Sequence, residues 1–272
     1  MRPLGTSVVG RAALVSLFLL GGAFVQPALA AAADGQDRPA PEAQPAGVPL
    51  NQPDFFFARP HAAISLRGGW LFAGAGSDLF DFVTEQLTID KGDFNAPAFD
   101  ADLAFPLSNH LEAVVGFNIS KVSHLSEYRD FVDNQLLPIE QTTTLTTRAV
   151  QGGVRYTLAP RGRNVSRFAW VPSRVVPYLG AGGGVVWYDF VQGGDFVDFV
   201  DLSIFSSRFR STGWTPSVHA IAGADIQLYR RLYLSMQGQY QWAAADLGED
   251  FVDFEPIDLS GFRVSTGVTL VF

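Results

Sequence analysis

Apolar side chains recur at every second position through most of this chain, and this alternation constrains the fold more than any other feature. The last segment places Phe262, Val264, Val268, Leu270 and Phe272 on one face. Successive side chains of a β-strand point to opposite faces, so a period of two predicts strands. Each such segment has about ten residues or more, which is the length of a tilted strand that crosses a bilayer.

Eight segments carry this pattern, at 62–72, 98–107, 111–121, 145–158, 175–190, 216–228, 232–242 and 261–272. Short turns are expected at 108–110 and 230–231, and longer polar connections at 73–96, 122–143, 191–214 and 243–259. Short turns at one end and long loops at the other are typical of an antiparallel up-and-down transmembrane barrel, with short periplasmic turns and long extracellular loops. The basic segment 159–174 is too long for a short turn, which leaves eight or ten strands open.

The alternation alone does not place the barrel in a membrane. A secreted β-sandwich or a lipocalin-like barrel alternates too, with its apolar side chains pointing inward. Small residues and glutamines on the polar faces favour a membrane barrel, as does the final Phe272. Charged residues are only 17% of the chain, below the roughly 25% of soluble domains. Aromatic residues expected near strand ends, as in interface girdles, are Trp70, Phe72, Phe105, Tyr178, Trp187, Tyr188 and Trp242.

The first residues predict a secretory signal peptide. Arg2 and Arg11 precede and open an apolar run that continues to Val25, and small residues lead to a cleavage site after Ala30. The alternative is an N-terminal membrane anchor, for which the run is short. Proline-rich sequence then favours an extended linker. The predicted division is a signal peptide at 1–30, a flexible linker at 31–58 and a barrel at 59–272.

Composition excludes several classes of function. The formal net charge is −8, so a nucleic-acid partner is not expected. The chain has no cysteine, which excludes a disulfide scaffold, a cysteine-ligated zinc site and a lipoprotein anchor. The histidines show no metal-ligand spacing, and no metal or cofactor is expected. They are His61, His110, His124 and His219.

Two segments resemble a known family. The final strand with Phe272 looks like the C-terminal signal that outer-membrane proteins present to their assembly machinery. The segment 176–184, Val-Pro-Tyr-Leu-Gly-Ala-Gly-Gly-Gly, resembles the Pro-Tyr-x-Gly-x-Gly strand of small OmpA-like and opacity-type outer-membrane barrels. The resemblance implies an integral outer-membrane protein without catalysis, surrounded by outer-membrane lipid and lipopolysaccharide. The chain departs from the pattern at 159–174, and no C-terminal peptidoglycan-binding domain is expected.

Charged residues on the polar faces are expected to point into the barrel. An eight-stranded barrel barely holds its own side chains, so these charges should pair and plug the lumen. The alternative is a narrow diffusion pore. The predicted lumen charges are Arg67, Asp100, Asp102, Glu112, Arg155, Asp225 and Arg263.

The predicted loops repeat the tripeptide Asp-Phe-Val. Because all four long loops leave the barrel at one end, the copies should form an acidic, aromatic surface. It could bind a basic or apolar extracellular partner or divalent cations. Alternatively, Phe and Val line the membrane interface while Asp solvates the loops. The candidate residues are Asp130, Phe131, Asp133, Asp195, Phe196, Asp198, Phe199, Asp201, Asp250, Phe251, Asp253 and Phe254.

One group of residues on a single strand is a candidate hydrolase site. Ser217 and His219 share a strand face with Asp225, as a hydrolase triad would require. Asp225 lies six residues beyond His219, about 20 Å along a strand, which is too far for a dyad. A lipid-modifying enzyme therefore ranks below a narrow pore as an alternative. The leading prediction is a non-enzymatic outer-membrane barrel that contributes to envelope integrity and surface interaction.

Overall fold

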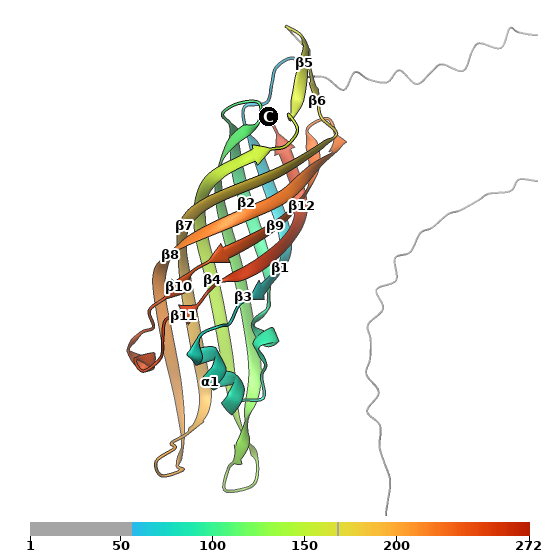
Figure 1. The fold of residues 1–272 in the computed structure, drawn as a ribbon. Helices are drawn as coiled ribbons and strands as arrows, with labels where there is room; N and C mark the ends of the chain where they lie inside the picture. Colours follow the sequence, from blue (N-terminus) through green and yellow to red (C-terminus); the bar gives the residue numbers. More distant parts are fainter. Residues whose placement is uncertain (1–55, 168) are drawn as a thin grey trace, which may run out of the picture. The chain divides into compact units, whose positions relative to one another are not determined.

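The computed structural model describes residues 56–167 and 169–272, and its main feature is a closed barrel of eight strands (Figure 1). Each barrel strand pairs antiparallel with the next one along the chain, and the last pairs with the first. The predicted all-β, eight-stranded up-and-down barrel is therefore confirmed. The strands are β1 (Ala63–Ala73), β2 (Ala96–Pro106), β3 (Leu111–Val132), β4 (Pro138–Thr157), β7 (Val175–Val197), β8 (Ile204–Tyr229), β9 (Leu232–Trp242) and β12 (Gly261–Val271).

The basic segment 159–174 adds no strand to the barrel. It forms a separate hairpin of β5 (Gly162–Ser166) and β6 (Ala169–Pro172), which settles the strand count at eight. Phe56, inside the predicted linker, exchanges two backbone hydrogen bonds with Trp170, of 2.8 and 2.9 Å. The rest of that linker up to residue 55, together with the predicted signal peptide, lies outside the described residues.

Two hairpins are much longer than the sequence predicts. β3, β4, β7 and β8 have 20 to 26 residues, whereas the other four barrel strands have 11 each. The connections expected at 122–143 and 191–214 are therefore mostly strand. In these extensions polar residues occupy both faces: Thr142 is exposed while the neighbouring Gln141 is buried. Without apolar alternation, such strands look like polar loops in the sequence.

The two ends of the barrel differ (Figure 1). The turn end, as we call it, carries the short connections after β2 and β8, the β5–β6 hairpin and the end of β12. The loop end carries the tips of the two long hairpins and several short elements. Those elements are α1 (Asp78–Gln86), η1 (Lys91–Phe94), β10 (Ala244–Ala245), η2 (Glu249–Phe251) and β11 (Ile257–Asp258). Among residues 56–167 and 169–272, no helix has the length and apolarity needed to cross a membrane.

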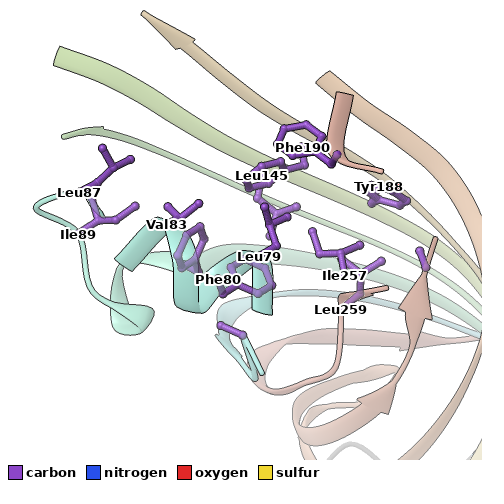
Figure 2. Close-up of a cluster of buried hydrophobic side chains, with 14 of the residues drawn as sticks. Leu79, Phe80, Val83, Leu87, Ile89, Leu145, Tyr188, Phe190, Ile257 and Leu259 are labelled. Atoms are coloured by element: carbon purple, nitrogen blue, oxygen red, sulfur yellow. The ribbon is translucent and has the colours of Figure 1, made fainter. Parts of the chain in front are cut away.

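An apolar cluster fills the barrel at the loop end. α1 buries Leu79, Phe80 and Val83, and Figure 2 shows them beside wall residues that include Leu145 and Phe190. The Phe80 ring lies 4.6 Å from Phe94 and 6.4 Å from Phe190, edge-on in both cases. Aromatic rings gain attraction in this geometry beyond the area they bury. The cluster therefore plugs this end with a hydrophobic core, which the sequence did not predict for segment 73–96.

We expect Phe80→Ala to loosen the loop end without opening the barrel. Removing a fully buried phenylalanine costs about 3–5 kcal/mol through lost burial and the cavity left behind. Limited proteolysis should cut the variant faster around α1, while the heat-dependent gel shift of the folded barrel persists. Glu85→Ala is the control, because Glu85 is an exposed residue of the same helix. Equal protease sensitivity of the two variants would contradict a core role for Phe80.

Candidate functional site

The barrel wall is polar inside and apolar outside, the reverse of a soluble barrel. On β1, Leu66 and Trp70 are 45% and 46% exposed, whereas Ser65 and Arg67 between and beside them are 1% exposed. Because side chains alternate across a strand, the exposed set faces the surroundings and the buried set faces the lumen. This arrangement contradicts a lipocalin-like barrel, whose apolar side chains would point inward.

The exposed apolar side chains form a continuous belt around the barrel. Aromatic residues border it: Phe72, Trp242 and Phe262 toward the loop end, and Tyr156 and Tyr229 toward the turn end. Tyr178 and Tyr188 do not belong to this border, because both point inward and are at most 1% exposed. Besides β1, the belt comprises Phe99, Leu103, Val115, Phe117, Val150, Val154, Leu179, Val185, Val218, Met236, Val264 and Val268, all 40–58% exposed.

Near the turn end, a four-member charge cluster crosses the lumen. Arg155 Nε donates to Glu112 Oε2 at 2.7 Å, and both side chains are almost fully buried. Arg161 contacts the other oxygen of Glu112, and its Nη2 lies 2.8 Å from Asp225 Oδ2. Arg161 thus connects β3 to β8 across the lumen. Buried charges are stable only when they are paired this closely.

Arg161 is the functional residue that sequence reasoning missed. It was placed in the basic segment 159–174, outside the barrel, although its guanidinium enters the lumen. One signal could have found it. The seven predicted lumen charges comprise four acids and three bases, and burial of an unmatched acid is costly. A fourth base was therefore required, and the adjacent basic segment was its nearest source.

The other predicted lumen charges lie nearer the middle of the barrel. Arg67 forms an ion pair with Asp102, and Arg263 Nη1 lies 3.3 Å from Asp100 Oδ1. All seven predicted residues therefore face the lumen, in two groups, and each of them contacts an opposite charge. The pairs neutralise the lumen locally, so no run of one charge sign is left to guide an ion through.

Glutamines bridge the lumen between these ion pairs and the apolar plug. Gln151 Nε2 donates to Gln241 Oε1 at 2.7 Å and accepts at Oε1 from Gln239 Nε2 at 2.8 Å. Tyr178 donates from its hydroxyl to Gln237 Oε1 at 3.1 Å, and the Arg155 guanidinium lies 4.5 Å from the Tyr178 ring. Amide pairs can satisfy one another without net charge, which suits a narrow interior.

The lumen leaves little free volume. A cavity beside Asp102 and His219 measures about 20 Å³, which holds about one water molecule. Ser217, His219 and Asp225 do not form a hydrolase triad, as the sequence predicts. Ser217 Oγ and His219 Nδ1 have no hydrogen-bond partner, and Asp225 pairs with Arg161. Among the described residues, no three His, Asp or Glu side chains converge as metal ligands.

The structure separates the acidic from the aromatic members of the predicted loop surface. Phe196 and Phe251 are 8% and 5% exposed, Phe131 and Phe254 are half-buried, and only Phe199 among these five is exposed, at 52%. The sequence predicts a loop surface that is both acidic and aromatic, but in the structure most of these phenylalanines point inward. Apolar rings gain more free energy by packing together than by facing water. The aspartates face outward: Asp130, Asp201, Asp250 and Asp253 are exposed, and Asp133, Asp195 and Asp198 half-exposed.

Aromatic contacts link all four loop-end connections. Phe82 of α1 lies 6.5 Å from Phe199 and 5.4 Å from Phe254, and Phe131 lies 5.9 Å from Phe199. Phe251 lies 5.5 Å from Phe190 on β7. The repeated phenylalanines therefore hold the connections together as one unit, which we call the loop-end head.

The Asp residues also fix the hairpin tips. At the β3–β4 tip, Asp133 Oδ1 accepts the backbone N–H of Gln135 at 2.7 Å and of Leu137 at 2.8 Å. At the β7–β8 tip, Asp198 and Asp201 each accept a backbone N–H two residues ahead. Hydrogen bonds from the side chain and backbone of Ser203 lower the pKa of the Asp201 carboxyl below its ordinary value. These carboxylates are part of the turn geometry.

No protein-family model and no curated protein matches the chain. Among solved structures, Neisserial surface protein A (NspA) matches at 12% identity and a TM-score of 0.45, over 78% of this chain and 96% of that one. OprG, an outer membrane protein from Pseudomonas aeruginosa, matches at 11% identity and a TM-score of 0.43, over 80% of this chain and 99% of OprG. Ail, the attachment invasion locus protein of Yersinia pestis, matches at 13% identity and a TM-score of 0.38, over 78% of this chain and 100% of Ail. Scores this low say nothing about function.

We expect Glu112→Gln to destabilise the barrel strongly. The change leaves Arg155 and Arg161 buried without their shared carboxylate, which costs about 3–5 kcal/mol. Urea unfolding in detergent micelles, followed by tryptophan fluorescence, measures the loss. Asp81→Asn is the control, because it breaks an ion pair with Lys91 in which both side chains are about half exposed, and such pairs contribute about 1 kcal/mol or less. Similar losses in both variants would refute the role of the Glu112 cluster.

Proposed function

We propose that this chain is a non-enzymatic integral outer-membrane protein whose plugged barrel supports the envelope and whose loop-end head contacts extracellular partners. The belt of exposed apolar side chains around a closed, polar-filled barrel carries the proposal. Only a closed barrel satisfies every strand hydrogen bond within lipid, and only lipid favours an apolar exterior of this extent. The sequence resemblance to small OmpA-like barrels supports the same assignment, as does the predicted signal peptide.

The filled interior favours a structural barrel over a diffusion pore. Ion pairs close the turn end and the middle, and the α1 cluster closes the loop end. A conducting path would require several of these buried contacts to open together. The lipid-modifying alternative is also disfavoured, because Ser217 and His219 face the lumen rather than the lipid.

The loop-end head offers a surface for a basic, apolar partner. Val200 and Leu136, at the two hairpin tips, are 94% and 81% exposed, and exposed apolar clusters often mark interaction sites. Leu136 and Leu202 have φ of 63° and 60°, a conformation that costs a non-glycine residue about 1–3 kcal/mol. Leu136 and Leu202 therefore lie in turns that carry this energetic cost, and both side chains are exposed near exposed carboxylates.

We expect Val264→Arg to impair membrane insertion. Val264 is an outward residue of the belt on β12, where an arginine near the bilayer midplane costs about 2–4 kcal/mol. Refolding into liposomes, scored by the heat-dependent gel shift, should give a lower folded yield than wild type. Thr142→Arg is the matched control, since Thr142 is exposed on β4 beyond the belt. Equal yields for both variants would contradict a membrane location.

The same refolded protein tests the pore alternative directly. In planar bilayers we expect a folded barrel without discrete channel openings. Sustained openings of the wild-type protein would replace the structural function with that of a small porin, while leaving the membrane assignment intact.

We expect the hairpin tips to select basic, apolar ligands. A peptide that alternates Lys and Leu should bind the protein in nanodiscs, whereas a peptide that alternates Glu and Leu should not. Fluorescence anisotropy should show at least a ten-fold weaker affinity for Val200→Ser/Leu202→Ser, because each side chain contributes roughly 1.5–3 kcal/mol when fully buried. Leu125→Ser is the control, an exposed leucine on the β3 wall away from the tip. Equal weakening in the control, or binding of the acidic peptide, would refute the proposal.

A further inference from the structure

The outer face of the barrel changes from apolar to basic where the long strands β3 and β4 extend beyond the belt toward the loop end (Figure 1). On β4, Val150 is an outward residue of the belt, and the next outward residue toward the loop end is the exposed Arg148. On β3, the exposed Lys121 lies two positions beyond Ile119 on the same face. The first charges above the belt on these two strands are therefore both positive.

The strand register brings these two bases together. Ile119 pairs with Arg148 and Lys121 pairs with Thr146, so Lys121 and Arg148 are diagonal neighbours on one face. Diagonal neighbours of an antiparallel pair lie about 7–8 Å apart, which is within the reach of long side chains. The Arg148 guanidinium also lies 4.7 Å from the centre of the Trp187 ring, an attraction that favours its position on the outer face. Lys121 and Arg148 can therefore contact the same phosphate group.

Asp189 is an acid of the same outer face, and another base neutralises it. Asp189 pairs with Thr146 in the register of β4 and β7, and its two carboxylate oxygens accept from Arg210 Nε and Nη2 at 2.8 and 3.0 Å. Within residues 56–167 and 169–272, neither Lys121 nor Arg148 forms an ion pair. Both charges are therefore available to a ligand outside the barrel.

Hydroxyl groups continue this face beyond the two bases. Ser123 and Thr144 form the next outward pair of β3 and β4, and their hydroxyl oxygens lie 2.8 Å apart. Thr142 follows on β4 and is also exposed. On the other side of the bases, Phe117 and Val150 pair within the belt. From the belt to the loop end, this wall thus presents apolar side chains, then two bases, then hydroxyl groups.

The wall formed by β1 and β12 lacks this order. Phe72 and Phe262 are outward residues at the border of the belt, and the residues two positions nearer the loop end are Gly74 and Ser260. Neither of these carries a charge. The basic step above the belt is therefore a feature of the β3–β4 wall and does not run around the barrel as a uniform ring.

We propose that the β3–β4 wall binds a phosphorylated glycolipid of the leaflet at the loop end. This inference rests on the membrane location proposed above. The acyl chains cover the belt, the phosphate lies against Lys121 and Arg148, and the sugars face Ser123 and Thr144. Hydrogen bonds between cationic side chains and phosphate oxygens are among the strongest that proteins form. A phospholipid matches the apolar and basic levels of the wall but has no sugar for the hydroxyl level.

The test measures glycolipid retention by the folded protein in neutral micelles. Native mass spectrometry should show that the wild-type protein retains diphosphorylated lipid A in preference to the same lipid without its phosphates. We expect Lys121→Gln/Arg148→Gln to weaken binding of the diphosphorylated lipid about ten-fold or more, because both charge-assisted contacts are lost. Arg163→Gln/Arg167→Gln is the matched control and should bind like wild type, since it removes the same charge from the β5–β6 hairpin at the turn end.

Four outcomes would overturn the proposal. Equal losses in the two glutamine pairs would mean a diffuse attraction to any exposed base. Equal retention of the two lipids by the wild-type protein would remove the role of the phosphate, and this comparison needs no variant to fold. Retention of phosphatidylglycerol as tight as that of the diphosphorylated lipid would remove the role of the sugars. Displacement of the lipid by millimolar inorganic phosphate would indicate a site for free phosphate.

The heat-dependent gel shift is recorded for every sample before lipid is added. It reports a folded barrel whatever the lipid result, so a failure of glycolipid binding leaves the proposed membrane location intact. That location is tested separately by Val264→Arg.

Discussion

Closure of the sheet is the constraint on which the rest of this structure depends. Once β12 pairs with β1, the barrel has no strand edge, and every side chain of its wall must face either the surroundings or the lumen. The exterior is then free to be apolar, but the lumen must accommodate everything polar in a space barely wider than its side chains. Ion pairs and glutamine hydrogen bonds satisfy the buried polar groups of the lumen, and the α1 cluster fills its loop end.

The period of two predicted the strands, because within the belt each strand faces two different environments, and the alternation of short turns with long loops predicted the barrel. The period of two did not predict the strand extensions beyond the belt, where both faces are polar. In the extensions of β3 and β4, Ser126 and Gln141 point inward while polar residues also face outward, so the alternation disappears although the strands continue. The facing of the seven lumen charges could be read from the sequence, whereas their partners could not, since pairing depends on neighbours around the ring.

The roles of Arg161 and of the Asp-Phe-Val repeats were predicted incorrectly for the same physical reason. Arg161 and the Asp-Phe-Val repeats were judged by local composition, which is basic in one case and acidic in the other. Their roles are set by contacts with distant segments: Glu112 and Asp225 for Arg161, and phenylalanines of other connections for Phe82 and Phe199. Helix α1 left a local trace, Leu79, Phe80 and Val83 on one face after Ser77, but its burial depends on the wall that surrounds it.

The position of Arg161 has a consequence for the order of assembly. Glu112 near the start of β3 and Asp225 near the end of β8 are neutralised by a residue from the connection between β4 and β7. Before that connection packs against the turn end, the Glu112 and Asp225 carboxylates lack the Arg161 guanidinium and stay hydrated. Docking of this connection therefore dries the mouth and joins distant strands in one step, so that a nascent barrel with its turn end still open is hydrated and less stable than the finished one.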